Sequence, residues 1–255
     1  MPDAQALRAE RLGPYFEAQL RFAGRMAELT GASLGAMTLR HTNLHRRLGF
    51  GVNLPGQDGA PGWKAYAAEL DAADDLAARV ALSQAACAAN PPEKIPLVGQ
   101  AGFGCFACDP PDDQGIVRIH FFNADTDAAG GPLASAKIAR RRAELAALTR
   151  HVLEVHPRAT VIRGKSWLYN VEAYRRLFPA DYAASRTVWT GSLHLTGTSS
   201  WGQIIDSLER VRPEMRDALL ANLQTLDPER PWLAFPLRVL ATEAPVESFA
   251  AEYGI

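Results

Sequence analysis

The sequence predicts a protein of mixed helix and strand, of the α/β or α+β class, in which a helical N-terminal region precedes a mixed β-sheet. Three observations lead to this prediction. Helical periodicity dominates the first ninety residues, runs rich in aromatic and β-branched residues begin near Pro96, and a predicted strand pair is followed by a long amphipathic helix and another strand. We therefore expect a helical region over residues 1–95 and a sheet-containing domain over residues 96–255.

Composition and charge limit the class of protein that the chain can be and the kinds of partner that it can bind. The 255 residues are 47% hydrophobic and 22% charged, which is typical of a globular chain with a sizeable core. Lys and Arg number 27 against 28 Asp and Glu, so no global field attracts nucleic acid or an anionic membrane. No signal-peptide pattern or long apolar window is present, and the three cysteines indicate reduced thiols. We expect a soluble, cytoplasmic protein with a small-molecule ligand and neither a nucleic-acid nor a membrane partner.

Apolar residues in the N-terminal region recur at helical spacing. Phe16, Leu20 and Ala23 share one face, and Gly31 is a suitable helix end. Ser33 is an expected N-cap, and Gly and Pro residues mark a loop after Leu48. The expected helices cover residues 14–30, 33–48 and 63–89, the last with a break at 71–75, and the expected loop covers residues 51–62.

The second region changes from helical to strand periodicity. The turn-prone sequence DPPDDQG separates two strand-like runs, so a β-hairpin is expected. A long amphipathic helix then lies between Pro132 and Pro157. Expected strands cover residues 103–107, 116–123, 159–163, 187–196 and 236–241, and expected shorter helices cover residues 171–178 and 212–226.

This order of elements carries a resemblance to a known family. The segment GIVRIHFFNADTDAAGGPL, the long helix, the strand ending in GKSWLYN and the helix VEAYRRLFP are similar to the central strand–helix–strand–helix unit of the GCN5-related N-acetyltransferases (GNAT). More narrowly, GGPL and SWL resemble a C-terminal acyltransferase-like domain of poorly characterised bacterial proteins. The resemblance covers about 90 residues, from 115 to 206, and implies a GNAT-like fold.

The resemblance implies an acyl-coenzyme A cosubstrate. In that family a glycine-rich turn opens the long helix, and its N–H groups receive the cofactor pyrophosphate at the positive end of the helix dipole. Gly130 and Gly131 stand at this turn, and Arg140 lies further along the helix as a second phosphate contact. The family's usual glycine spacing is absent, and Pro132 removes one donor. An ordinary loop and helix start is therefore the alternative interpretation.

The SWLYN segment supplies the other residues that the resemblance implies. Asn170 matches a family Asn at the strand end, and Tyr174 on the next helix matches the family's general acid, with Tyr169 as the competing donor. His120 or Asp125 would be the base. The substrate-binding candidates are Ser166 and Trp167. The alternative is that the aromatic residues are packing residues, and that Asp125 only forms a turn.

Histidines and cysteines offer weaker sites. His41 and His45 are four residues apart, so on one helix they would share a face, and His120 could add a third metal ligand. The sequence HTNLH lacks a catalytic Glu, and neighbouring arginines disfavour a divalent cation, so we expect no metal. The single CxxC of Cys105 and Cys108 indicates ordinary buried thiols.

Three functions are consistent with these residues. The first hypothesis is an N-acyltransferase that moves an acyl group from a thioester to an amine. The second is a noncatalytic binding or assembly protein on a degenerate acyltransferase fold, which the missing glycine consensus favours. The third is a small metallohydrolase that uses His41, His45 and His120.

Overall fold

The chain forms two compact units, each assembled from two stretches of sequence. The computed structural model describes residues 4–51, 59–90, 99–197 and 199–255. Unit 1 comprises Met1–Ile95 and Gly191–Pro236, and unit 2 comprises Pro96–Thr190 and Leu237–Ile255. Residues 191–236, which the sequence analysis grouped with the sheet, are thus part of the helical unit.

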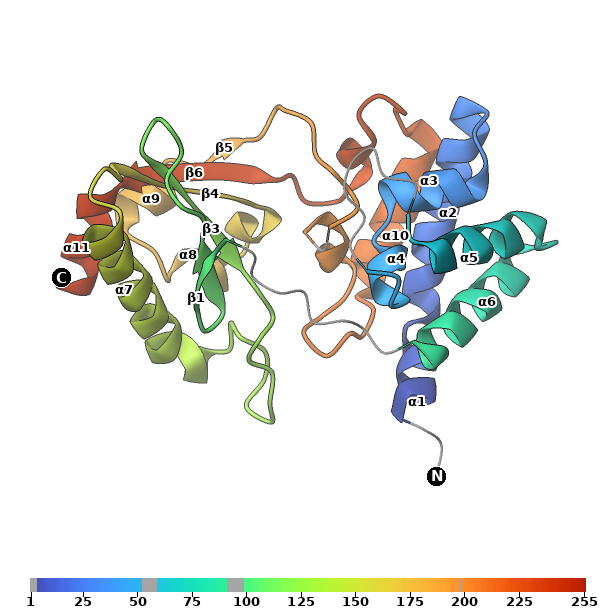
Figure 1. Cartoon of the computed structure of the whole chain (residues 1–255), viewed down its shortest axis with the longest axis horizontal. Helices are drawn as coiled ribbons and strands as arrows, with labels where there is room; N and C mark the ends of the chain where they lie inside the picture. The colour runs from blue at the N-terminus through green and yellow to red at the C-terminus, as the bar shows by residue number, and fades with distance from the viewer. Residues whose placement is uncertain (1–3, 52–58, 91–98, 198) are drawn as a thin grey trace. The chain divides into compact units, whose positions relative to one another are not determined.

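Helices with clear capping signals build the first stretch of unit 1 (Figure 1). Gly31 adopts φ 71° at the end of α2, and its N–H donates to Ala27 O. The Ser33 hydroxyl accepts from Ala36 N, and Asp75 Oδ1 accepts from Ala78 N at 2.8 Å. The helices are α1 (Ala4–Arg11), α2 (Gly13–Thr30), α3 (Leu34–His41), α4 (Leu44–Arg47), α5 (Pro61–Ala72) and α6 (Leu76–Ala89).

The helix expected over residues 33–48 is in fact two helices. Thr42 is extended, with φ −127° and ψ 167°, and ends α3. Asn43 N then donates to Gln19 Oε1 at 3.0 Å, so a side chain of α2 replaces the helical acceptor. The expectation that His41 and His45 share one helix is wrong for this reason. Most of the expected loop, residues 52–58, lies outside the described residues.

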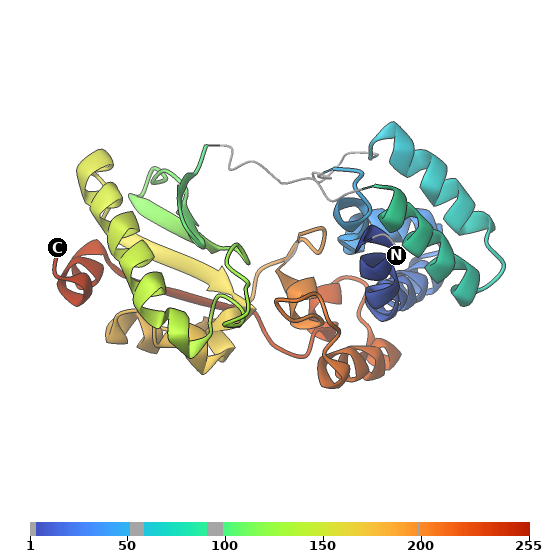
Figure 2. The ribbon, with the colours of Figure 1, turned by 90° about the horizontal axis from the view of Figure 1, so that it is seen from below.

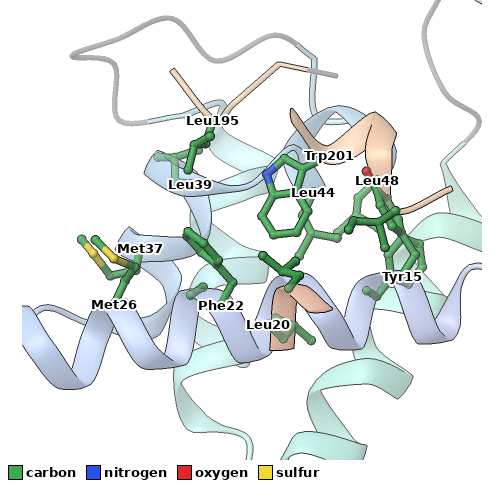
Figure 3. Packing of buried hydrophobic residues seen from close by; sticks show 14 of the residues in the cluster. Tyr15, Leu20, Phe22, Met26, Met37, Leu39, Leu44, Leu48, Leu195 and Trp201 are labelled. Carbon is green, nitrogen blue, oxygen red and sulfur yellow. The ribbon is translucent and has the colours of Figure 1, made fainter. Parts of the chain in front are cut away.

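The second stretch of unit 1 belongs there because its apolar side chains pack into the helical core. Trp201 is fully buried, with its ring centroid 5.4 Å from Phe22 and 4.9 Å from Phe235. Its indole N–H donates to His41 O at 3.1 Å. Figure 3 shows Leu195 beside Leu39 within the same cluster. The elements are η3 (Ser200–Gln203), α10 (Pro213–Asn222), η4 (Leu223–Thr225) and η5 (Pro231–Ala234).

Unit 2 contains a six-stranded mixed sheet, which confirms the predicted fold class. Its order is β1-β2-β3-β4-β6-β5, and of the adjacent pairs β3 and β4 are parallel, whereas the others are antiparallel. The long helix that connects β3 to β4 makes this parallel pairing possible. The strands are β1 (Ala101–Phe103), β2 (Phe106–Cys108), β3 (Ile116–Phe121), β4 (Val161–Ser166), β5 (Thr187–Val188) and β6 (Leu240–Pro245).

Helices cover one face of this sheet. Leu145, Leu148 and Val152 of α7 share a buried cluster with strand residues and with Phe249 of α11. α7 and α11 lie side by side (Figures 1 and 2). The elements are η1 (Ser135–Lys137), α7 (Ile138–Val155), η2 (Trp167–Asn170), α8 (Glu172–Arg175), α9 (Ala180–Ala184) and α11 (Val246–Tyr253).

Several strand boundaries differ from the sequence expectation. The strand expected over 187–196 spans only Thr187–Val188, followed by one backbone hydrogen bond from Trp189 N to Val239 O, and residues 191–236 belong to unit 1. The last strand spans Leu240–Pro245 and not residues 236–241. Its pairing with β4 determines these bounds. The helix α11 that follows was not expected. Partners elsewhere in the chain thus determine where these strands begin and end.

Candidate functional site

The parallel strands β3 and β4 separate at their carboxyl ends. Their pairing runs from Ile116↔Val161 to Ile119↔Gly164. Beyond that point β3 continues to pair with β2 as far as Phe121, and β4 continues to pair with β6 as far as Ser166. In sheets with helical crossovers, ligands bind at the carboxyl ends of such strands. This strand separation is therefore the candidate site in unit 2.

Lys137 holds together the loop that leads from β3 into the long helix. Asp127 and Gly130 exchange backbone hydrogen bonds of 3.2 and 3.0 Å, and Gly130 adopts φ 110°. The buried Lys137 Nζ donates to Asp125 O at 2.8 Å, to Asp125 Oδ1 at 3.0 Å and to Gly130 O at 3.0 Å. It also lies 3.0 Å from Asp127 Oδ1. The Gly130 N–H that an anion would need already donates to Asp127 O.

Two further cations pair with the same loop. Arg140 Nη1 donates to Asp125 Oδ2 at 2.9 Å, and the buried Arg141 Nη2 donates to the same oxygen at 2.8 Å. Arg141 also donates to Glu144 Oε1 at 2.6 Å and contacts the Cys105 thiol. Hydrogen bonds from Lys137 and Arg140 lower the pKa of Asp125. The predicted phosphate contact Arg140 is thus paired with the predicted base Asp125.

The predicted general acids lie in the core, beneath the sheet. Tyr174 and Tyr169 are 2% and 1% exposed. Tyr169 Oη lies 2.6 Å from Tyr182 Oη, and the Tyr174 ring packs against Tyr169 with centroids 5.1 Å apart. Burial, followed by the neighbouring tyrosines, raises the pKa of Tyr169 and of Tyr174 well above the usual value. In this arrangement neither phenol meets solvent, so the packing interpretation describes them.

Gly164 is the residue that lets these phenols lie so close to the strand. A Cβ at this position would lie 1.8 Å from Tyr169 Oη and 2.3 Å from Tyr182 Oη. Any side chain there would displace both hydroxyls. Tyr182 was not singled out in the sequence, and Gly164 was named only as part of the segment GKSWLYN.

The remaining SWLYN residues make local bonds. The Ser166 hydroxyl accepts from Leu168 N at 3.1 Å and caps η2. Asn170 Nδ2 donates to Trp167 O at 2.7 Å and to Arg238 O at 2.9 Å, which ties η2 to the residue stretch before β6. Trp167 is 6% exposed. These contacts hold the backbone of η2 in place. Ser166 is the last residue of β4 and borders the strand separation.

His120 has a carboxylate partner that the sequence analysis missed. Its Nε2 lies 2.9 Å from Asp109 Oδ2, outside hydrogen-bond alignment, and Gln100 Nε2 donates to Asp109 Oδ1 at 2.7 Å. His120 pairs with Ala107 in the β2–β3 hairpin, next to the strand separation. The imidazole is partly exposed, and its buried Nε2 lies beside the Asp109 carboxylate without a hydrogen bond to it.

The structure does not bring the histidines of the metallohydrolase hypothesis together on one element. His41 ends α3, His45 lies on α4, and His120 belongs to unit 2. The buried His45 ring packs edge-on against Trp63, with centroids 6.1 Å apart. Burial, together with Arg46, lowers the pKa of His45 to about 4. Within the described ranges, no group of three or more His, Cys, Asp or Glu side chains is placed to hold a metal ion.

The cysteines are buried free thiols, as expected. Burial raises the pKa of Cys108 to about 11 and also raises that of Cys105. Cys105 lies in the turn between β1 and β2, where its backbone N–H donates to Glu144 Oε2 at 3.0 Å. These thiols are therefore poor nucleophiles.

Unit 1 carries a surface groove of about 580 Å³ between α2, α6 and α10. Two of its arginines are already paired on α2, Arg21 with Glu17 and Arg25 with Glu28. The groove is otherwise lined largely by apolar side chains, and it presents no catalytic constellation.

Comparisons with known proteins add no assignment. No family model matches the chain, and neither curated proteins nor solved structures give a match. No helix in the described ranges has the length and apolar character needed to cross a bilayer. The function must therefore be argued from the residues themselves.

Proposed function

We propose that the chain is a noncatalytic binding or assembly protein whose unit 2 uses an acyltransferase-like sheet without thioester chemistry. One observation carries the proposal. Asp125 lies in the loop where a cofactor phosphate would be expected, and it takes the charges of Lys137, Arg140 and Arg141. A phosphate would have to compete with this carboxylate for the same cations.

The buried phenols support the same proposal. An acid that protonates a leaving thiolate must lie within hydrogen-bond reach of it. Tyr169 and Tyr174 are enclosed by Phe121, Phe178 and each other, and Tyr169 bonds Tyr182. Their hydroxyls are therefore enclosed in the core and do not reach a substrate.

The ligand surface in this proposal is the strand separation. Strand ends that no longer pair with each other leave backbone groups available to an extended ligand that carries amides. His120 on β3 and Ser166 on β4 border this gap. A neutral, amide-bearing ligand suits the gap better than a polyphosphate, since the nearby loop has no unpaired excess of cations.

A second candidate is the N-acyltransferase. The strand separation and the β3–α7–β4–α8 order, which match the resemblance, favour it. His120 beside Asp109 would then be the base. This candidate requires Lys137 and Arg140 to exchange Asp125 for the cofactor phosphate.

Pantetheine and coenzyme A distinguish the two candidates, because they share the extended amide arm and differ in the phosphates. Amide NMR titrations of the full chain should show pantetheine and coenzyme A perturbing His120, Phe121 and Lys165 with similar millimolar affinity. Incubation with acetyl-coenzyme A and a panel of amines should release no free thiol above a protein-free control.

Three results would contradict the proposal. If coenzyme A binds at least about a hundredfold more tightly than pantetheine, and Asp125→Asn tightens it further, the loop is a phosphate site. If thiol release depends on His120, as tested with His120→Gln, the protein is an acyltransferase. If neither compound perturbs the strand ends, the ligand surface has been misplaced.

A further inference from the structure

Three arginines of unit 1 surround one carboxylate. Arg8 Nε and Nη2 donate to the two oxygens of Glu209 at 2.7 and 2.9 Å, Arg47 Nη1 contacts Oε1, and Arg11 Nη2 lies 3.9 Å from Oε2. The side chains of Arg8 and Arg47 are only 13% and 18% exposed. Among the described residues, Glu209 is the one acid that pairs with these three arginines. The three arginines carry two more positive charges than Glu209 neutralises, one of them on Arg11, whose side chain is 45% exposed.

Arg47 is connected through Tyr15 to further buried polar side chains, and several of their N–H groups have no acceptor. The Tyr15 hydroxyl donates to Asn43 Oδ1 at 3.1 Å, and Arg47 lies over the Tyr15 ring, 5.6 Å from its centroid. Arg47 Nε, Asn43 Nδ2 and Gln19 Nε2 are buried and have no hydrogen-bond partner within the part of the chain that the structure describes. Asn43 and Gln19 are themselves fully buried. Buried N–H groups without acceptors indicate a missing acceptor.

Glu209 reaches this cluster from a backbone conformation that favours glycine. Its φ is 59°, and no other non-glycine residue in the described ranges has a positive φ. It lies near the tip of a short loop closed by the Ile205↔Val211 bridge, and Asp206 Oδ1 shapes the loop by accepting from Leu208 N and Arg210 N at 2.8 and 2.9 Å. A side chain in this region is strained, and such strain concentrates at ligand sites and switches.

We propose that Arg8, Arg11 and Arg47 form a binding site for a phosphate-type dianion, in which Glu209 occupies the ligand's place until the ligand displaces it. The planar guanidinium fork matches the oxygens of phosphate, as it matches those of a carboxylate. A dianion would neutralise two of the three arginine charges, whereas the Glu209 carboxylate neutralises one. Departure of Glu209 would also allow the loop to leave its strained conformation. The site lies wholly within unit 1 and is independent of the function proposed for unit 2.

The test is phosphate binding by the full chain at constant ionic strength, measured by calorimetry and by the rise in Tm against chloride. The wild type should bind inorganic phosphate weakly, in the millimolar range, because Glu209 competes. Glu209→Gln removes the competing charge and should tighten phosphate binding at least about tenfold. Glu209→Gly, which also relieves the positive φ, should do the same. Adding Arg47→Met to Glu209→Gln should abolish the gain.

Controls separate a ligand site from a structural ion-pair network. Arg21→Met, which breaks an exposed pair on α2, should leave phosphate binding unchanged. Each Tm rise is measured against the same variant without phosphate, so a destabilised variant remains informative. Glycerol 2-phosphate identifies the source: tighter binding than inorganic phosphate indicates a phosphomonoester, and equal binding indicates the free ion. If Glu209→Gln and Glu209→Gly bind phosphate no better than the wild type, the arginines serve only the fold and the proposal fails.

Discussion

At Gly164 the absence of a side chain leaves room for two tyrosine hydroxyls beneath the sheet. The phenols of Tyr169 and Tyr182 share a hydrogen bond in the space that a Cβ would fill. A buried hydroxyl needs such a partner, whereas phenylalanine would need none. The residue types that resemble a catalytic motif in the sequence are therefore explained by packing and hydrogen bonding in the core.

His45 leads to a prediction about pH. Its pKa in the folded protein is about 4, against an ordinary value of about 6.5, so the unfolded chain binds the proton more tightly. The contribution of neutral His45 is complete above pH 6.5 and is lost as pH falls from 6.5 towards 4, by up to about 3 kcal/mol. Urea unfolding of the wild type and of His45→Leu between pH 4 and 7.5 should show this loss only in the wild type.

The outcome that contradicts this prediction is a pair of parallel stability curves. His41 provides the comparison, because burial, followed by Arg40, also lowers its pKa but the side chain is less enclosed. His41→Leu should therefore remove a smaller part of the pH dependence than His45→Leu does.

At the scale of elements, α6 depends on its N-terminal cap. Asp75 Oδ1 accepts from Ala78 N at 2.8 Å, and the first turn of the helix has no other side-chain cap in the described structure. Asp75→Ala should lower the free energy of unfolding by about 1 kcal/mol, as measured by urea denaturation. Asp74→Ala is the matched control and should change it by less than about 0.5 kcal/mol. Equal effects of the two substitutions would contradict the capping role.

The long helix α7 shows what periodicity captures and what it misses. Leu145, Leu148 and Val152 recur at three- and four-residue steps and form a buried stripe, whereas Val155, which continues the same spacing, is 54% exposed. Arg141 lies four residues before Leu145 and is as buried as the stripe itself. An arginine at a position of the buried stripe indicates that an acidic side chain lies close to it in the core. This pattern could have predicted the ion pairs of Arg141 with Asp125 and Glu144.

At the scale of the molecule, the chain enters unit 1 twice, and Trp201 on the second stretch completes the core made by the first. Trp201→Ala should destabilise unit 1 by about 3 to 5 kcal/mol, because a fully buried indole is lost. Amide hydrogen exchange should accelerate in α2 and α3 and remain slow in β3 and β4.

The control for this prediction is Trp189→Ala. Trp189 is half-exposed in unit 2, where Lys165 lies 4.5 Å from its ring centroid, so a small effect confined to unit 2 is expected. Uniform acceleration of exchange across both units after Trp201→Ala would show that they unfold as one cooperative body and would contradict the division.

Local signals in the sequence determined α2 and its end at Gly31, the cap at Ser33, the break between α5 and α6 within residues 71–75, the hairpin around DPPDDQG, and the mixed helix–strand class, whereas α1 and the division of residues 33–48 into two helices were not expected. Each depends on residues within a few positions of one another, where backbone geometry and short-range hydrogen bonds dominate. The acyltransferase resemblance rests on similar short segments and stays a prediction.

Tertiary structure alone decided the rest. The assignment of residues 191–236 to the helical unit, the end of β3–β4 pairing at Gly164, the pairing of Asp125 with three cations and the meeting of Arg8, Arg47 and Glu209 all join residues far apart in the chain. Burial and charge pairing depend on which distant surfaces meet, and neither composition nor periodicity encodes that meeting. The candidate sites are therefore properties of the folded chain.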